Sequence, residues 1–443
     1  MKRLAVVLVA LLGAACSSAG GGDCPTESGT GCAPKSARVD LYEPTFSDPT
    51  TVTNPLFPIA MLDSVVFSGT VDGKPFRTET TLLPETKTLE WNGREIEALV
   101  SQYMAFSGGR IEEVALDYYA QDDIGAVWYL GEDVADYDKE GVIFTHEGTW
   151  RVGVDGAPLS MIMPSVPHVG DAYLAENTPP SAWEELTVLS VDLVVSGPSG
   201  PIPGAMVGSE LHMDGEREEK VFAPGYGEFS TGSIETDNLE ALALAIPADA
   251  LSGGVPAELE TLAAGTADLF DAAEAGDWSR ARTTLDTVKS SWESYRAGGV
   301  PPLLEAEMDR ILDALAKNVA RLNPQQARHH TIALTRVIFD FFLRYETRTD
   351  IDRVRLDLWL AQVIVDAGTG IPGPVRGDAA TLELVWNRVA HTFDAPTSAR
   401  IEADLSELRR AARVENFEQA IETATRLRAT FAEIGWRGTD GSD

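Results

Sequence analysis

Six residues in one acidic segment have the spacing of a calcium-binding EF-hand loop. At loop positions 1, 3, 5, 6, 8 and 12 they are Asp136, Asp138, Glu140, Gly141, Ile143 and Glu147. An EF-hand also needs a helix on each side of its loop, whereas residues 127–130 and 142–145 have the composition of strands. We therefore expect residues 138–141 to form a hairpin turn. This leaves a weak calcium candidate, formed by Asp136, Asp138, Glu140 and Glu147.

Paired carboxylates could support acid-base hydrolysis, and two adjacent pairs occur in the first half of the chain. They are Glu112-Glu113 and Asp122-Asp123. Neighbouring residues on a strand point to opposite faces, so neither pair should meet as a catalytic dyad. A glycoside hydrolase would need two carboxylates roughly 5 to 10 Å apart in a cleft, and that arrangement depends on the fold. A carboxylate-dependent envelope hydrolase therefore stays an alternative, without assigned catalytic residues.

The histidines lack the spacing of a metal or cofactor site. His146, His168 and His212 are far apart in the sequence, so each is expected at the surface or with a hydrogen-bonding partner. His329 and His330 begin a predicted helix, where adjacent side chains point about 100° apart and do not readily share one metal. The sequence contains no Cys-x-x-Cys-His, Glu-x-x-His or Gly-x-Ser-x-Gly motif. It predicts no metal ligand, no cofactor and no catalytic residue.

Cys16 has the clearest predicted chemistry. Two basic residues precede a short apolar run, residues 4–12, and three small residues then lead into Cys16. This order is typical of a signal peptide over residues 1–15, and the run is shorter than the about 20 residues that cross a bilayer. The segment resembles the bacterial lipobox, although Gly13 stands where leucine is commonest. The resemblance implies cleavage before Cys16, lipidation of this cysteine and stable anchoring through its acyl chains.

The residues after Cys16 predict where the protein is anchored and how. Ser17, not aspartate, follows the cysteine, and resemblance to known sorting signals then implies the outer membrane of a two-membrane bacterium. Residues 16–39 are rich in small and polar residues, which is typical of a flexible tether. The tether contains Cys24 and Cys32, which could pair in an oxidising compartment. Their spacing alone leaves this pairing open.

The formal net charge of −34 is unevenly distributed along the 443 residues. Residues 1–250 contain 39 acidic and 13 basic residues, a net charge of −26, and residues 251–443 contain 30 and 22, a net charge of −8. Such a surface repels nucleic acid and anionic lipid headgroups, so neither is an expected partner. Solubility is one explanation of the acidic half, and capture of a cation or a basic ligand is the other.

Residues 40–245 have the alternation and the turn spacing of a meandering antiparallel sheet. Residues 65–71 and 76–82 flank Asp72-Gly73, a common hairpin turn. No helix of crossover length separates the strands, so a parallel sheet is not expected. Further strands are expected at residues 95–106, 110–121, 126–130, 142–147, 187–195, 209–212 and 219–222.

Six phrases within residues 45–232 resemble, in the same order, a widespread family of uncharacterised bacterial secreted proteins. They are VTNPLFP (52–58), DYYAQD (117–122), VWYLGE (127–132), GTW (148–150), MP (163–164) and FAPGYG (222–227). The resemblance implies a curved antiparallel sheet, similar to the half-barrels of periplasmic lipoproteins. It implies no catalytic residue.

From residue 255 to 436 the apolar period changes to 3.6, which is typical of a helical bundle. Two helices are expected around a break at Gly276-Asp277, where Asp277 would cap the second helix. The segments around Asp277 and Asn416 match at an offset of 139 residues, either as related hairpins or as a recurring local pattern. Further helices are expected at residues 303–322, 325–346, 350–367, 379–392, 397–413 and 416–434.

A mixed-charge segment lies inside this predicted bundle. Its arginines are Arg344, Arg348, Arg353 and Arg355, and its acids are Glu346, Asp350, Asp352 and Asp357. Alternating charge of this kind is typical of a solvated ion-pair face.

The sequence as a whole predicts segregated α+β domains, an antiparallel half-barrel or curved sheet over residues 40–245 and a helical bundle over residues 255–436. The expected function is non-catalytic ligand binding or scaffolding by a lipid-anchored envelope protein. The expected partners are the membrane, an envelope protein or a small apolar ligand.

Overall fold

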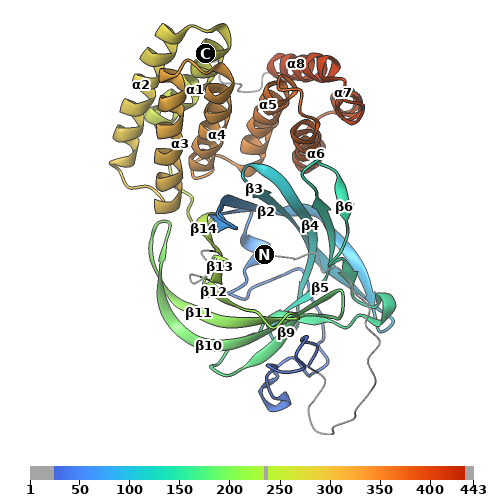
Figure 1. Ribbon diagram of the computed structural model, residues 1–443. Helices are drawn as coiled ribbons and strands as arrows, with labels where there is room; N and C mark the ends of the chain where they lie inside the picture. The colour runs from blue at the N-terminus through green and yellow to red at the C-terminus, as the bar shows by residue number, and fades with distance from the viewer. Residues whose placement is uncertain (1–23, 234–237, 435–443) are drawn as a thin grey trace.

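The computed structural model describes residues 24–233 and 238–434. A strongly curved antiparallel sheet occupies the N-terminal part, and two groups of helices lie along one side of it (Figure 1). The predicted fold class, an antiparallel sheet followed by a helical bundle, is confirmed. A helix with the length and apolar character to cross a membrane is not found among the described residues.

Fourteen strands of the described chain form this sheet. They are β1 (Ser64–Val71), β2 (Lys74–Trp91), β3 (Arg94–Ser107), β4 (Arg110–Gln121), β5 (Val127–Tyr137), β6 (Ile143–Thr145), β7 (Trp150–Arg151), β8 (Ser160–Met163), β9 (Ala172–Thr178), β10 (Ala182–Gly197), β11 (Gly200–His212), β12 (Arg217–Ala223), β13 (Gly227–Ser233) and β14 (Asn238–Ile246). The order across the sheet is β6-β5-β4-β3-β2-β1-β14-β13-β12-β11-β10-β9, and β7 and β8 also pair with β5. The sheet is thus a meander in which β1 joins β14.

Tight turns set the register of the first strands. Asp72 and Gly73 between β1 and β2 have φ angles of 53° and 70°, as a two-residue hairpin turn requires. Asn92 and Gly93 between β2 and β3 repeat this geometry, with φ angles of 50° and 71°. Asparagine, aspartate and glycine tolerate these left-handed angles at low cost.

The predicted strands agree best with the structure where apolar and polar residues alternate clearly. The predicted strand at residues 110–121 coincides with β4, whereas β2 extends nine residues past its predicted end at residue 82. The strands β7, β8, β9, β13 and β14 lie outside the predicted strands. The β14 sequence, NLEALALAI, is rich in residues that favour helices, and it becomes a strand through its pairing with β1 and β13.

Eight α-helices of the described chain form two groups of four. The first group is α1 (Ala257–Ala275), α2 (Trp278–Arg296), α3 (Pro302–Ala320) and α4 (Pro324–Phe342). The second is α5 (Arg348–Ala367), α6 (Pro372–Val389), α7 (Ala395–Arg413) and α8 (Phe417–Glu433). Each group surrounds its own apolar core, and α4 contacts α5 where the groups meet.

The predicted capped hairpins are present at both ends of the helical part. Asp277 accepts a hydrogen bond from the Arg280 amide at the start of α2, and Asn416 accepts one from the Gln419 amide at the start of α8. In each hairpin the capping residue also donates its own amide to the preceding helix, over 2.9 Å to Ala272 and to Ala411. The two segments therefore share cap geometry as well as their apolar pattern.

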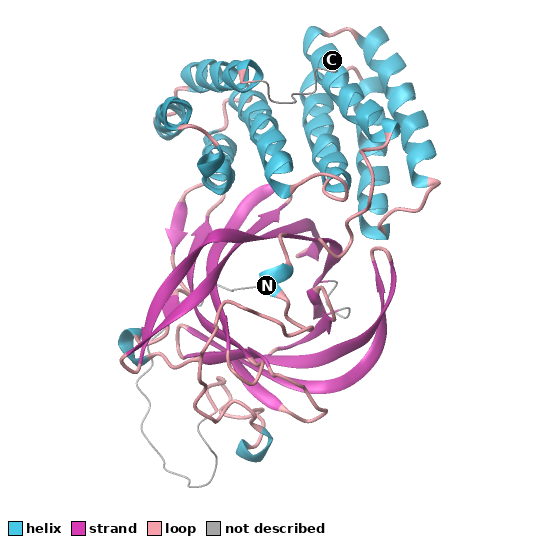
Figure 2. Ribbon diagram, turned by 180° about the vertical axis from the view of Figure 1, so that it is seen from behind, coloured by secondary structure: helices cyan, strands magenta, loops and turns pink. Residues whose placement is uncertain are grey.

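The two parts of the chain share their apolar cores. Val66 of β1 and Leu244 of β14 are buried in the same cluster as Trp292 of α2. Phe106 of β3 stacks on Trp359 of α5, with ring centroids 5.7 Å apart. Figure 2 shows from behind how the helices cover one rim of the sheet. The helical bundle is thus docked on the sheet through buried contacts.

The predicted flexible tether is wrong for residues 24–39. The Ala33 amide donates to Glu185 over 2.6 Å, and the Val39 amide donates to the Ala172 carbonyl over 2.9 Å. These contacts dock the segment on the edge strand β9 and on β10, because unpaired edge groups and a buried carboxylate offer acceptors to its backbone. A Cys24–Cys32 disulfide closes a small loop in it, with Cα atoms 5.7 Å apart. Residues 1–23, with the predicted signal peptide and Cys16, lie outside the described residues.

Candidate functional site

A cavity of about 170 Å³ lies where residues 57–62 pack against the curved sheet. Its apolar wall is formed by Phe57, Ile59, Leu62, Val65 and Phe67. Its polar wall comes from β2, β3, β4, β12, β13 and β14, and its charged members are Asp117, Lys220, Glu228 and Glu240. Three tyrosines, Tyr103, Tyr119 and Tyr226, complete its aromatic lining.

Strand register places hydroxyl groups next to carboxylates in this lining. Ser101 of β3 lies opposite Asp117 of β4. Thr231 of β13 lies opposite Glu240 of β14 and also opposite Lys220 of β12. Directly opposed residues have their Cβ atoms about 5 Å apart, so each hydroxyl can share a ligand group with its neighbouring carboxylate.

Two of these hydroxyls are buried without a hydrogen-bond partner among the described residues. Ser101 is fully buried and Thr231 is 7% exposed, and both residues belong to the lining of the cavity. A buried hydroxyl that finds no partner costs about 1–3 kcal/mol, so native proteins usually satisfy it with protein, water or ligand. The lining thus includes two polar side chains whose hydrogen-bonding capacity the described residues leave unused.

Burial and mutual repulsion perturb the acids of the cavity. Burial, followed by the charges of Glu228 and Glu218, raises the pKa of Glu240 from 4.5 to about 7. Burial also raises the pKa of Glu228, although the positive charge of Lys220 opposes this. The Asp117 carboxylate accepts a hydrogen bond from the Tyr129 hydroxyl over 2.7 Å. The site is acidic, and a positive charge placed in it would be stabilised.

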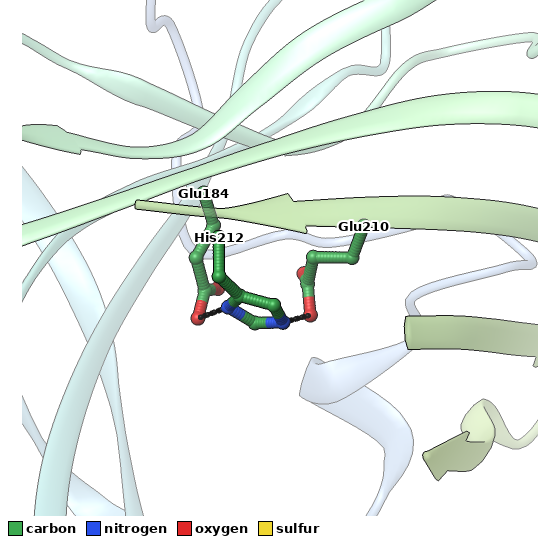
Figure 3. Close-up of side chains that lie close together, drawn as sticks. All are labelled: Glu184, Glu210 and His212. Atoms are coloured by element: carbon green, nitrogen blue, oxygen red, sulfur yellow. Dashed lines mark ion pairs between the residues drawn. The ribbon is translucent and has the colours of Figure 1, made fainter. Parts of the chain in front are cut away.

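A chain of charged side chains continues from the cavity wall into β10 and β11 (Figure 3). The Lys220 ammonium lies 3.0 Å from Glu210, and His212 lies between Glu210 and Glu184, at 3.6 Å and 3.4 Å. Burial opposes protonation of His212, but Glu184 and Glu210 outweigh it and raise its pKa to about 9. Burial, and then the charge of Glu184, raise the pKa of Glu210 from 4.5 to about 8, although the charges of Lys220 and His212 oppose this.

The same cluster agrees with the prediction that His212 lies at the surface or has a hydrogen-bonding partner, because two carboxylates lie beside its ring. Ligand atoms of Glu184, Glu210 and His212 lie within 4.8 Å of one another, a spacing that a metal ion could use. The two carboxylates face different nitrogens of the imidazole ring, one on each side of it (Figure 3). The geometry suits an ion-pair chain. His212 is close to Glu184 because the two residues are opposed across β10 and β11, which sequence spacing does not reveal.

The weak calcium candidate is a β-hairpin in the structure. Asp136 pairs with Thr145 across β5 and β6, and the Asp138 side chain accepts hydrogen bonds from the Glu140 and Val142 amides. Strands flank the loop on both sides, as predicted, and helices are not found there. Asp138 uses its carboxylate to stabilise the turn.

Calcium titration of the whole protein is therefore expected to show no site tighter than about millimolar, the weak end of the EF-hand range. Isothermal titration calorimetry measures this directly. Micromolar binding that disappears in both Asp136→Ala and Glu147→Ala would contradict the hairpin interpretation.

The adjacent carboxylate pairs do not line the cavity. Asp122 is buried and accepts hydrogen bonds from the Trp128 indole and the Ala126 amide, at 2.8 Å and 2.9 Å. Asp123 binds Thr45 and Ser47 at the surface. Each aspartate thus holds a loop in place through its hydrogen bonds. As expected, the two adjacent carboxylates have different partners and do not form a dyad.

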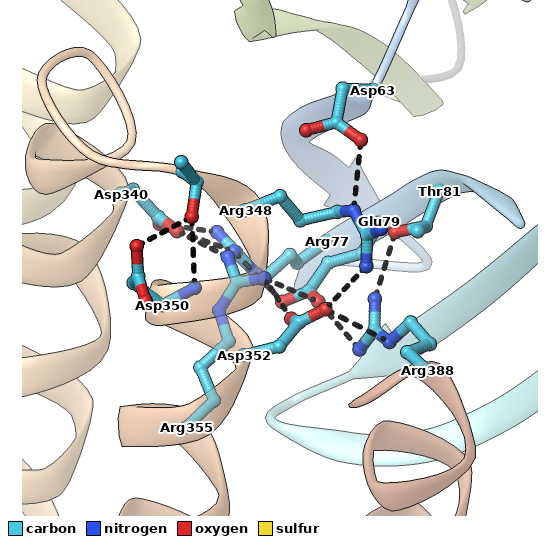
Figure 4. A network of polar contacts seen from close by, with 11 residues as sticks. Asp63, Arg77, Glu79, Thr81, Asp340, Arg348, Asp350, Asp352, Arg355 and Arg388 are labelled. Atoms are coloured by element: carbon cyan, nitrogen blue, oxygen red, sulfur yellow. Dashed lines mark hydrogen bonds and ion pairs between the residues drawn. The ribbon is translucent and has the colours of Figure 1, made fainter. Parts of the chain in front are cut away.

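A buried ion network joins the sheet to the helices (Figure 4). Arg77 of β2 donates two hydrogen bonds to Asp340 of α4, over 2.7 Å and 2.9 Å, and Arg355 of α5 donates a third over 3.0 Å. Arg388 of α6 donates to Thr81 of β2 over 2.8 Å. Burial opposes ionisation of Glu79, but the charges of Arg355, Arg77 and Arg388 outweigh it and lower its pKa.

The predicted solvated face is therefore wrong for half of the charged segment. Arg348, Asp352 and Arg355 are buried in this network, while Arg353 and Asp350 form a partly exposed pair. Their alternating charges resemble those of a surface helix, but β2 supplies Arg77 and Glu79 as partners. The pairing needs residues that are 263 positions apart, so local charge pattern does not show it.

No known protein family matches the chain, and no curated protein is similar enough to count as a relative. The acids of the cavity were likewise missed by sequence reasoning. One available signal was charge at alternate positions within predicted strands, as in Glu210 and His212 or Glu218 and Lys220. Charges at alternate positions lie on one face of a strand, and they exclude an ordinary apolar core on that face.

Proposed function

We propose that this protein is a lipid-anchored cell-envelope protein that binds a small ligand in the cavity of its β domain, without catalysis. The observation that carries the proposal is the cavity itself, whose lining includes the buried residues Ser101 and Thr231. A concave site with apolar walls and a few convergent polar groups is the usual form of a ligand site.

The size and lining of the cavity define the ligand more closely. A cavity of about 150 Å³ holds benzene, so about 170 Å³ suits a body of roughly one ring. The wall formed by residues 57–67 provides the apolar contacts, but four charged groups line the rest. The expected ligand was small and apolar; the lining favours a small ligand that has an apolar body and also a polar group.

Co-purification tests ligand binding. Protein isolated from its native envelope under gentle conditions should carry a small molecule that native mass spectrometry detects. Ser101→Ile should lose this molecule, since it fills the cavity and removes the hydroxyl, while Thr88→Ile, at an exposed position of β2, should keep it. Circular dichroism checks that both variants are folded. An empty wild-type protein, or a folded Ser101→Ile that keeps the ligand, would count against the proposal.

The lipid anchor supports an envelope location, because Cys16 follows a signal-like segment. Cys16→Ser should abolish incorporation of a fatty-acid label and move the protein from the membrane pellet to the soluble fraction, because acyl chains provide the anchoring. Ser17→Ala serves as the matched control and should keep both label and pellet. Membrane association of Cys16→Ser at the wild-type level would refute anchoring through this residue.

The alternative of a carboxylate-dependent hydrolase keeps one supporting observation. Asp117, Glu228 and Glu240 line one cavity, and the raised pKa of Glu240 would suit a general acid. We favour binding because a glycosidase must hold sugars on both sides of the bond it cleaves, and this cavity takes a body of roughly one ring. Hydrolysis of a chromogenic glycoside that Glu240→Gln abolishes would reverse this preference.

A further inference from the structure

The docking of residues 24–39 leaves only a short connection between Cys16 and the folded body. Seven residues, 17–23, separate Cys16 from Cys24. Cys24 is held by its disulfide, and close to it the Glu27 amide donates to the Met213 carbonyl over 2.7 Å. Even a fully extended chain covers at most about 3.6 Å per residue, so Cys16 lies within roughly 30 Å of Cys24. A bilayer that holds acyl chains on Cys16 therefore lies next to the part of the body that holds Cys24.

This docked segment lies on the side of the sheet away from the helices. In Figure 1 it is the darkest blue part of the ribbon, at the bottom, with the sheet between it and the helices. It is fixed there by side chains of two strands, since the Glu185 carboxylate accepts from the Ala33 amide and the Arg217 guanidinium donates to the Gly31 carbonyl over 2.7 Å. The anchor and the helical bundle are thus on opposite sides of the sheet.

Three segments meet where the docked segment continues into the chain. They are residues 39–45, the turn between β4 and β5 and the loop between β8 and β9. The Asn54 side-chain amide joins the turn to the loop, because it donates to the Gly125 and Pro164 carbonyls over 3.0 Å and 2.9 Å. The Tyr42 hydroxyl joins residues 39–45 to the same turn, because it donates to the Asp122 carboxylate.

These three segments expose a group of apolar side chains, here called the apolar rim. Its members, between 36% and 66% exposed, are Leu41, Tyr42, Ile124, Val166 and Val169. Exposed apolar side chains that occur singly need no explanation, whereas a group of them is typical of an interaction surface. None of the five is charged, so a bilayer can cover them without the cost of burying a charge.

We infer that the apolar rim rests on the bilayer that holds the lipid anchor, and that the helical bundle points away from it into the aqueous compartment. This inference rests on the proposed anchoring through Cys16. The acyl chains provide the attachment, and the apolar rim sets the orientation, because apolar side chains at a bilayer surface bind in proportion to the apolar area that they bury. The helices are then open to an envelope partner.

Quenching by labelled lipids tests this orientation on the whole lipidated protein. The lipid occupies Cys16 and the disulfide occupies Cys24 and Cys32, so an introduced cysteine gives one site for a fluorophore. In phosphatidylcholine vesicles with a nitroxide on the headgroup, a fluorophore at Val166→Cys should lose most of its emission. A fluorophore at Thr287→Cys, an exposed position of α2, should keep its emission. Equal quenching at both positions, or stronger quenching at Thr287→Cys, would overturn the inference.

Charged substitutions test whether the apolar rim itself makes the contact. Ile124→Asp with Val166→Asp should leave the protein in the membrane pellet, because the acyl chains remain, but should remove the quenching of a fluorophore at Val169→Cys. Val142→Asp with Phe144→Asp, at exposed apolar positions of the hairpin beside α6 (Figure 1), is the matched control and should keep that quenching. Circular dichroism checks that both variants are folded. Full quenching in a folded Ile124→Asp, Val166→Asp protein would show that the rim does not make the contact.

Sedimentation of the same vesicles separates this inference from the proposed anchoring. Protein that pellets while the fluorophore at Val166→Cys stays unquenched keeps the anchor and overturns the inference. Protein that stays in the supernatant would refute anchoring through Cys16, and the inference with it. Emission at Val166→Cys that changes with protein concentration in the absence of vesicles would assign the apolar rim to a second copy of the chain instead.

Discussion

Asp340→Asn is expected to lower the free energy of unfolding by about 3–5 kcal/mol, the usual cost of removing one partner of a buried ion pair. Asp340 is fully buried and accepts two hydrogen bonds from Arg77 and one from Arg355. Asparagine has nearly the same shape but no charge, so two buried guanidinium groups would each lose one of their counter-ions. Because Arg77 lies on the sheet and Arg355 on α5, the loss also loosens the junction of the two parts.

Urea unfolding followed by circular dichroism measures this effect as a lower midpoint. Asp313→Asn on α3 is a matched control at an exposed position, and its change should stay within about 0.5 kcal/mol. The double variant Arg77→Met with Asp340→Leu should recover part of the loss, since apolar residues of similar volume can replace a buried pair. A change below about 1 kcal/mol in Asp340→Asn would show that the network adds little to stability.

Glu240→Gln is expected to raise the free energy of unfolding of the ligand-free protein by about 1–3 kcal/mol at pH 8, and to change it little at pH 4.5. Burial and the charges of Glu228 and Glu218 raise the pKa of Glu240 to about 7 in the folded protein, against an ordinary value of 4.5. Folding therefore takes up a proton between these two pH values. The stability of the wild type falls as the pH rises through this window, because Glu240 must then ionise in a buried acidic site.

Thermal unfolding at a series of pH values tests the sign of this effect. The difference between Glu240→Gln and the wild type should grow from pH 4.5 to pH 7 and then level off. Glu219→Gln, on the exposed side of β12, should show no such growth. A Glu240→Gln protein that is less stable than the wild type at pH 8 would mean that the carboxylate is paired favourably in the folded state.

Local chemistry explains most of what the sequence predicted correctly. The Asp72-Gly73 turn, the strand at residues 110–121 and the caps at Asp277 and Asn416 each depend on residues within about a dozen positions. Helix periodicity likewise requires contact only between neighbouring turns. The predictions are wrong where contacts with residues far along the chain determine the local structure. β14 has a helix-favouring composition but pairs with β1, and residues 24–39 dock on β9 and β10.

Residue order and local pattern are enough to predict the order of the two parts, the antiparallel sheet, the helical hairpins, the acidic character of the first half and a lipidated Cys16. Which charges meet depends on the tertiary structure. It placed Asp117, Glu228 and Glu240 around one cavity and Arg77 against Asp340. Strand register and domain docking bring these groups together across tens to hundreds of residues. Their burial then determines whether a charge is solvated, paired or left to bind a ligand, and the local sequence pattern does not record that burial.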